Sequence, residues 1–278
     1  MIDAHQHFWK RSRGDYAWLT PDLDALYRDF GPSDLAPHLA EFGIQRTVAV
    51  QAAPTLAETE YLLDLADATP WVAGVVGWVD MASPAALEDI DRLATHPALC
   101  GLRPMIQDIS DPDWMLREAL TPALRKLVEK DLAFDALIRP THLGRLLRLL
   151  ARHPDLRVVI DHGAKPEISQ GKFDAWARDM ASIARESSAH CKLSGLVSEA
   201  AEGWTHETLR PYVDHLLECF GTERLLWGSD WPVSLLGGGY GPWREATSRL
   251  LANLEPAALA QVLGGNAERF YRLRKGNS

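Results

Sequence analysis

Short runs of β-branched and aliphatic residues alternate with amphipathic stretches along the whole chain, and this alternation limits the possible folds more than any other feature. Runs typical of buried strands cover residues 2–8, 46–52, 71–79, 99–106, 133–138, 157–162, 190–195 and 224–230. Helical periodicity covers residues 33–43, 58–68, 84–94, 121–130, 141–153, 173–186 and 207–221. Strands that alternate with helices indicate a parallel sheet with both faces covered.

Eight such units in 278 residues predict a single α/β domain over residues 1–278, folded as a (β/α)8 TIM barrel. An open doubly wound sheet would need a glycine-rich phosphate turn after its first strand. The first strand is followed by "HQHFWK", which contains no glycine. The long segment 9–32 that comes next is rich in Trp, Tyr, Pro and Asp, and a loop of this length is usually functional.

Composition excludes several classes of partner. A net charge of −9 without basic runs argues against a nucleic-acid surface. No stretch approaches the roughly 20 apolar residues of a membrane helix, and the N-terminus does not read as a secretion signal. The widely spaced cysteines Cys100, Cys191 and Cys219 form no C-x-x-C pair, as is typical of a reducing compartment. We expect a cytoplasmic protein with a small-molecule substrate and no nucleic-acid or membrane partner, and we leave its oligomeric state open.

Two histidines near the N-terminus raise the question of a metal or catalytic site. His5 and His7 are two positions apart in a strand, so both side chains point to one face. Two imidazoles on one face can chelate a cation or bracket a water molecule. A single H-x-H is common by chance, and its meaning depends on what the other strands contribute.

The carboxyl ends of barrel strands meet at one mouth, so the polar residues there should converge. The candidates are His5, His7, Trp78, Asp80, Arg103, His162, Lys192, Ser194 and Asp230. Taken singly, His162 could be a satisfied core histidine, Asp230 could cap a turn, and Lys192 could reach solvent. Taken together, three imidazoles and a carboxylate are ligand types that zinc accepts, and Asp230 can also act as a base.

The order of these motifs resembles the amidohydrolase superfamily over the full chain. The matching elements are D-x-H-x-H at Asp3–His7, "VIDHGAKP" with His162, "WGSDWP" with Asp230, and the closing "LGGNAERFY". The segments "DAHQHFW", "DYAWL" and "GLRPMIQD" make the chain similar to the sugar lactonases of the amidohydrolase-2 branch, which act on L-fuconolactone and L-rhamnonolactone. The resemblance implies hydrolysis of a sugar-acid lactone, such as L-fuconolactone, to the open-chain aldonate.

The sequence departs from the binuclear members of this superfamily. Those members use a bridging carboxylated lysine or glutamate after strand 4 or 5, and a histidine on strand 5. Here Arg103 ends the fourth strand, and His142 lies beyond Pro140 in an expected helix. We therefore expect at most one zinc or other divalent ion, held by some of His5, His7, His162 and Asp230. Several members of the branch need no metal, so turnover can be metal-independent.

Lactone hydrolysis assigns a role to each candidate. Asp230, flanked by His5, His7 and His162, is the expected base, and it can return its proton to the leaving alkoxide. Arg103 is the expected oxyanion donor, with His162 or His7 as co-donors. Asp135 lies in an apolar strand and needs a partner, for which Arg103 on the neighbouring strand is the expected one.

The tryptophans bear on the substrate. Trp9, Trp78 and Trp231 lie near strand ends and, with Trp18 from the long loop, could form a platform for a small hydroxylated ring. Asp80 and Lys192 could bind its hydroxyls. Trp71, Trp176 and Trp227 are expected in the core.

Three alternatives remain open. A 2-pyrone-4,6-dicarboxylate-type lactonase would need several arginines at the mouth, where only Arg103 is placed, although Arg11, Arg13 and Arg139 could be recruited. A zinc-dependent decarboxylase of the same branch would use the same ligands. A non-catalytic sugar-binding barrel would keep the tryptophans but has no need of Asp230 among three histidines.

Overall fold

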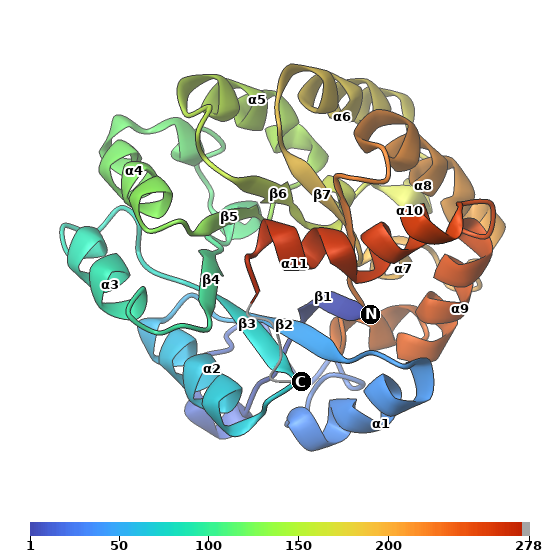
Figure 1. The fold of residues 1–278 in the computed structure, drawn as a ribbon, viewed down its shortest axis with the longest axis horizontal. Helices are drawn as coiled ribbons and strands as arrows, with labels where there is room; N and C mark the ends of the chain where they lie inside the picture. Colours follow the sequence, from blue (N-terminus) through green and yellow to red (C-terminus); the bar gives the residue numbers. More distant parts are fainter. Residues whose placement is uncertain (274–278) are drawn as a thin grey trace.

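Eight parallel strands follow one another in sequence order and curve into a barrel in the computed structural model, which describes residues 1–273 (Figure 1). They are β1 (Ile2–Gln6), β2 (Arg46–Val50), β3 (Val72–Gly77), β4 (Leu99–Leu102), β5 (Ala133–Ala136), β6 (Val158–Ile160), β7 (His190–Leu193) and β8 (Leu225–Trp227). A parallel bridge between Gln6 and Trp231 joins β1 to the segment after β8. The predicted (β/α)8 barrel is confirmed.

Helices form the outer ring around the strands (Figure 1). Seven of them match predicted segments: α1 (Pro32–Phe42), α2 (Leu56–Ala68), α3 (Ala86–Leu93), α4 (Thr121–Glu129), α5 (Leu143–Arg152), α6 (Asp174–Glu186) and α8 (His206–Phe220). The sequence analysis did not find α7 (Leu196–Glu199), α9 (Tyr240–Leu250), α10 (Pro256–Ala260) or α11 (Asn266–Phe270). None of the helices within residues 1–273 is long and apolar enough to cross a membrane.

The strands are shorter than the apolar runs that predicted them. The run 157–162, for example, keeps only Val158–Ile160 as β6, and its last two residues, Asp161 and His162, leave the sheet. Pairing ends there because the backbone at His162 takes a left-handed φ of 53°, which interrupts the extended conformation of a strand. The sequence pattern therefore located each strand but placed its carboxyl end too far along.

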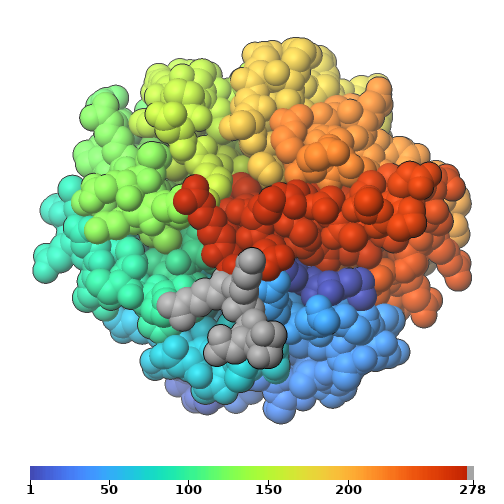
Figure 2. Space-filling model, in the orientation of Figure 1, coloured from blue at the N-terminus to red at the C-terminus, as the bar shows by residue number. Residues whose placement is uncertain are grey.

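The C-terminal helices close the end of the barrel at which the strands begin. α10 and α11 cross the face shown in Figures 1 and 2. Gly264, just before α11, lies so close to β1 that an added Cβ would be 2.9 Å from the backbone nitrogen of Ile2. With this end covered, the opposite end, where the strands finish, is left for the site.

Candidate active site

Asp230 lies at the centre of a buried cluster of histidines at the carboxyl ends of the strands. Its Oδ1 atom is 3.3 Å from Nε2 of His7, 3.7 Å from Nε2 of His5 and 3.8 Å from Nε2 of His162. Each of the four residues is at most 4% exposed. The structure therefore brings together residues from β1, from the turn after β6 and from the turn after β8.

The backbone determines how His7 presents its ring. Its Nδ1 atom lies 2.7 Å from the carbonyl oxygen of Val50 and donates to it, so a neutral His7 carries a lone pair on Nε2. That lone pair faces the carboxylate of Asp230. His7 Nε2 is also 3.1 Å from Nε2 of His5.

His162 lies in a turn whose backbone is in the left-handed conformation. Its φ angle is 53°, and those of Gly163, Ala164 and Lys165 are 56°, 62° and 52°. Each non-glycine residue in this conformation costs about 1–2 kcal/mol, and such strain is typical of functional sites. The His162 Nδ1 atom lies 2.9 Å from the Ser194 hydroxyl, which orients the ring.

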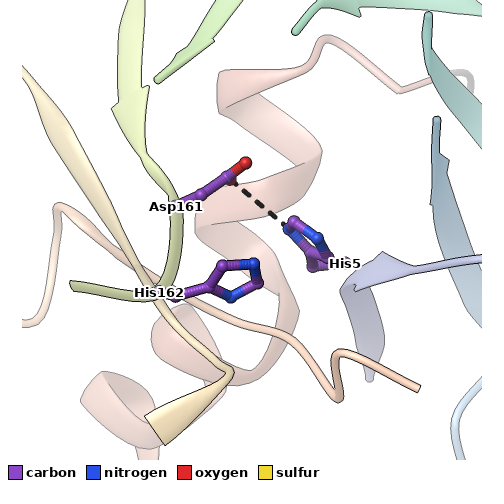
Figure 3. Close-up of side chains that lie close together, drawn as sticks. All are labelled: His5, Asp161 and His162. Atoms are coloured by element: carbon purple, nitrogen blue, oxygen red, sulfur yellow. Dashed lines mark ion pairs between the residues drawn. The ribbon is translucent and has the colours of Figure 1, made fainter. Parts of the chain in front are cut away.

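Asp161 is a site residue that the sequence analysis missed. Figure 3 shows it pointing at His5, whose Nδ1 atom is 3.4 Å from Asp161 Oδ1. Arg103 Nη1 is 3.4 Å from the other carboxylate oxygen, and Lys192 Nζ is 3.0 Å from Oδ1. The available signal was a carboxylate directly before His162 in the buried run "VVIDHG", where a charge without partners would be costly.

The expected pair of Asp135 with Arg103 is wrong. Asp135 Oδ2 is 2.6 Å from Lys192 Nζ and accepts a hydrogen bond from the Tyr271 hydroxyl at 2.6 Å. Arg103 instead reaches Asp161 and donates to the carbonyl oxygen of Gln51. Lys192 is completely buried and pairs with both Asp135 and Asp161, and its Nζ atom is 3.0 Å from Nδ1 of His5. It therefore cannot reach substrate hydroxyls from this position.

Burial sets the charge state of the cluster. It lowers the pKa of His5, of His7 and of His162, the last to about 4. Burial alone would raise the pKa of Asp230, but His162 and the contact with His7 outweigh it and hold that pKa below its ordinary value. At neutral pH the cluster is therefore a carboxylate among neutral imidazoles.

This donor set fits one divalent cation. The ligand atoms of His5, His7 and Asp230 lie within 4.8 Å of one another, and those of His5, Asp161 and His162 form a second group that shares His5. The Nδ1 contact of His7 with a backbone carbonyl is typical of zinc-ligating histidines. The facing lone pairs of His7 and Asp230 also require a positive group between them. Arg103 Nη1, 3.4 Å from His5 Nε2, places a competing positive charge nearby.

A cavity of about 180 Å³ opens onto Asp230, His7, His162 and Arg103. Its other lining residues are Trp18, Ala52, Met105, Gln107, Asp108, Leu137, Lys165 and Val233. Lys165, at the end of the left-handed turn, pairs with Glu199 at 3.5 Å. Lys165 lies in the quoted segment "VIDHGAKP", and Gln107 and Asp108 end the segment "GLRPMIQD", but none of the three was predicted as a site residue.

The expected aromatic platform is divided by the fold. Trp9 and Trp231 are buried in the apolar core, each packed edge-on against Phe30, and neither lines this cavity. This corrects the expectation that both contact substrate, because their rings are already covered by protein. Trp78 and Asp80 line a second, adjacent cavity. Of the four expected platform tryptophans, Trp18 alone lines both cavities.

Comparison with known proteins gives consistent matches along the whole chain. A family model described as amidohydrolase matches residues 2–273. The chain is 50% identical to an L-fucono-1,5-lactonase of Burkholderia ambifaria, covering 98% of this chain and 95% of that protein. It is 33% identical to an L-fucono-1,5-lactonase of Burkholderia multivorans, covering 98% and 96%. An amidohydrolase crystal structure from Burkholderia multivorans, with bound zinc, superposes with a TM-score of 0.92 at 32% identity, covering 98% and 99%.

Proposed function

We propose that this chain, which belongs to the amidohydrolase family, is a lactonase that hydrolyses the cyclic ester of a sugar acid. L-Fucono-1,5-lactone is the expected substrate, because the relatives at 50% and 33% identity carry that name. The observation that carries the proposal from this chain's own residues is the carboxylate of Asp230 surrounded by three imidazoles in a cavity of about 180 Å³. This arrangement supports activation of water beside a small ring.

Asp230 is proposed to take a proton from water as the water oxygen bonds to the lactone carbonyl carbon. The facing lone pair of His7, 3.3 Å away, then shares that proton, which removes the repulsion between the two acceptors. When the ring C–O bond breaks, the proton passes to the departing ring oxygen. The products are a hydroxyl group and a carboxylic acid on one open chain. The acid then releases the second proton of the water and becomes a carboxylate, so the atoms of lactone and water are all accounted for.

Arg103 is proposed to stabilise the oxyanion of the tetrahedral intermediate, since it lines the cavity and its Nε atom has no partner among the described residues. His162, whose ring is oriented by Ser194, lies across Asp230 and is proposed as a neutral co-donor. Lys165 reaches the same cavity from the end of the left-handed turn. These roles are predictions that mutation can test one residue at a time.

A divalent ion such as zinc is proposed to occupy the cluster, held by some of His5, His7, His162 and Asp230, with one ion at most. A bound ion would polarise the lactone carbonyl as a Lewis acid. Arg103 already supplies positive charge at the same place, so hydrolysis is expected to continue at a reduced or equal rate when the ion is removed. We further propose a cytoplasmic enzyme of carbohydrate metabolism, in keeping with its three free cysteines.

A neutral substrate suits the charges of the cavity better than a dicarboxylate. The positive side chains on its lining are Arg103, balanced by Asp161, and Lys165, balanced by Glu199. Asp108 and Asp230 add negative charge to the same surface. Arg11 and Arg139, which a pyrone dicarboxylate could have recruited, are not among the lining residues.

A panel of lactones read with a pH indicator tests the function, because hydrolysis releases acid. The panel contains L-fucono-1,5-lactone, its 1,4-isomer, other sugar lactones and 2-pyrone-4,6-dicarboxylate, each with and without chelator. Rapid acid release from a sugar lactone supports the proposal. Release from the pyrone alone, carbon dioxide release from an aromatic acid that chelator abolishes, or sugar binding without turnover would each identify one of the other functions.

A further inference from the structure

A second cavity, of about 410 Å³, lies beside the catalytic one at the barrel mouth. The two share Trp18, Met105 and Asp108 on their linings, so a molecule in one can extend into the other past these side chains. The second cavity covers the ends of β2, β3 and β4. The catalytic steps described above use no residue that lines only this cavity.

The two cavities differ in volume, and so in the size of ligand that each can hold. Sites for drug-sized ligands have volumes of about 300–1,000 Å³. The catalytic cavity, at about 180 Å³, is below that range and suits a single small ring, whereas the second cavity lies within the range. A lactone of one sugar acid would fill the first cavity and leave the second without an occupant.

The second cavity has the chemistry of a carbohydrate site. The indoles of Trp18, Trp78 and Trp114 line it with apolar surface, and Asp15, Asp80 and Asp108 add carboxylates. Asp15 is paired with Arg13 at 2.7 Å. The other two carboxylates are exposed, and each accepts a single short-range hydrogen bond, from the Ala82 backbone and from the Gln107 side chain.

We propose that the second cavity is a subsite for a neutral sugar ring attached to the lactone, so that the enzyme hydrolyses lactones of glycosylated sugar acids as well as of single ones. The inference rests on the proposed lactonase activity and names a wider substrate class for it. A sugar ring has an apolar face for an indole and hydroxyls that donate to Asp80 and Asp108.

The lining argues against other substituents. Among residues 1–273, no lysine or arginine lines the second cavity, so an anionic group there would meet carboxylates without compensation. A plain alkyl chain would fill the apolar part but would remove water from the carboxylates and give them no donor in return. A hydroxylated neutral ring satisfies both parts of the surface.

The test compares one lactone with its own glycosylated forms. The substrates are L-fucono-1,5-lactone and the same lactone carrying a β-D-glucosyl group on each free hydroxyl in turn. For at least one derivative we expect kcat/KM at or above that of the unsubstituted lactone. Efficient hydrolysis of the unsubstituted lactone together with loss of every derivative would overturn the inference and leave the lactonase proposal intact.

Two variants alter the second cavity alone. Trp78→Ala removes one indole and should lower kcat/KM for the accepted derivative by about tenfold or more, with little change for the unsubstituted lactone. Trp71→Ala, which changes the tryptophan that precedes β3 as Trp78 follows it, is the matched control and should affect both substrates equally. Ala17→Trp, at an exposed lining position, should block the derivative even if Trp78→Ala fails to fold.

Binding separates failure of the subsite from failure of the activity. Saturation-transfer NMR with methyl β-D-glucopyranoside reads the cavity without turnover, and Ala17→Trp should abolish its signal. If no lactone is hydrolysed, the proposed function fails while this signal still decides the subsite. Equal losses for both substrates in Trp78→Ala, or an unchanged NMR signal in Ala17→Trp, contradict the subsite.

Discussion

The Nε2 atom of His7 and the Oδ1 atom of Asp230 face each other across 3.3 Å, and at neutral pH neither atom carries a proton. The backbone oxygen of Val50 holds the proton of His7 on the other ring nitrogen. Two lone pairs at this separation repel unless a positive group lies between them. The site is thus built with a place for one proton or one cation before any substrate arrives.

Asp230→Asn should lower lactone turnover by about 10²- to 10⁴-fold, the usual contribution of a general base, while the fold is retained. The amide keeps the shape of the side chain but cannot accept the proton from water. Initial rates with a pH indicator measure the loss. Asp64→Asn, on the exposed face of α2, is the control and should have the parental rate. A parental rate in Asp230→Asn would move the base to His7 or His162.

The pH profile should show no acid limb near the ordinary pKa of histidine. Burial lowers the pKa of His162 to about 4, and the pKa of Asp230 is also held down, so both groups are unprotonated from about pH 6 to 8. We expect kcat/KM to be flat over that range and to fall as the pH approaches about 4, where His162 gains a proton. A limb centred near pH 6.5 would show that the histidines titrate as if exposed.

One equivalent of zinc should bind per chain. Both possible ligand groups, one with His7 and Asp230 and one with Asp161 and His162, need His5, so they cannot each hold an ion. The strand-5 histidine that would bind a second ion also has no counterpart in this chain. Elemental analysis after dialysis gives the stoichiometry. His7→Gln should lower the zinc content, whereas His206→Gln, at a partly exposed position on α8, should leave it unchanged. Two equivalents that both depend on His7 would contradict the single site.

Gly195→Ala should displace His162 and inactivate the enzyme. A Cβ at position 195 would lie 2.5 Å from Nδ1 of His162, where the Ser194 contact now orients the ring. The backbone at Gly195 has a φ of 64°, which adds about 1 kcal/mol of strain. Gly203 has a similar φ of 77°, but a Cβ added there would have no described atom within 4 Å. Gly203→Ala should therefore add only the backbone strain. The ratio of kcat values between the two variants isolates the effect on His162.

Lys192→Met should destabilise the fold by about 3–5 kcal/mol, because it leaves Asp135 and Asp161 buried without their shared cation. Urea unfolding followed by tryptophan fluorescence measures the change. Lys172→Met removes an exposed lysine that pairs with Glu167, and this control should change stability by about 1 kcal/mol or less. Similar unfolding midpoints for the two variants would mean that the buried ammonium is unimportant.

The barrel could be predicted because the hydrophobic pattern of each strand indicates that the strand is buried, without information from the other strands. Most strand residues are apolar, with buried exceptions such as Asp135 and Lys192. That pattern survives even where strands such as β6 have only three residues in the sheet. The helices after β8 were missed because "GGGYGPWREATSRL" begins with glycines and reads as a loop. Its helix, α9, forms because Tyr240 and Trp243 are buried against the barrel.

The histidines and Asp230 could be predicted because polar side chains at strand ends converge in any barrel. Asp161 could not be separated from its neighbours by position alone, since its role depends on Arg103 and Lys192 from other strands. The tryptophans were the least predictable residues. An indole near a strand end can pack inward, as Trp9 does, or line a cavity, as Trp78 does, and local sequence does not distinguish these outcomes.

The contact between His7 and Asp230 also determines when the enzyme becomes active during its synthesis. The two residues are 223 positions apart, and the closing bridge between Gln6 and Trp231 spans a similar interval. A ribosome therefore exposes His5 and His7 long before it makes their carboxylate. Until then the nascent chain has β1 without its β8 neighbour, and an unpaired strand edge of this kind is prone to aggregation. A chain that ends before Asp230 lacks the proposed base, so we expect truncated translation products of this kind to be inactive.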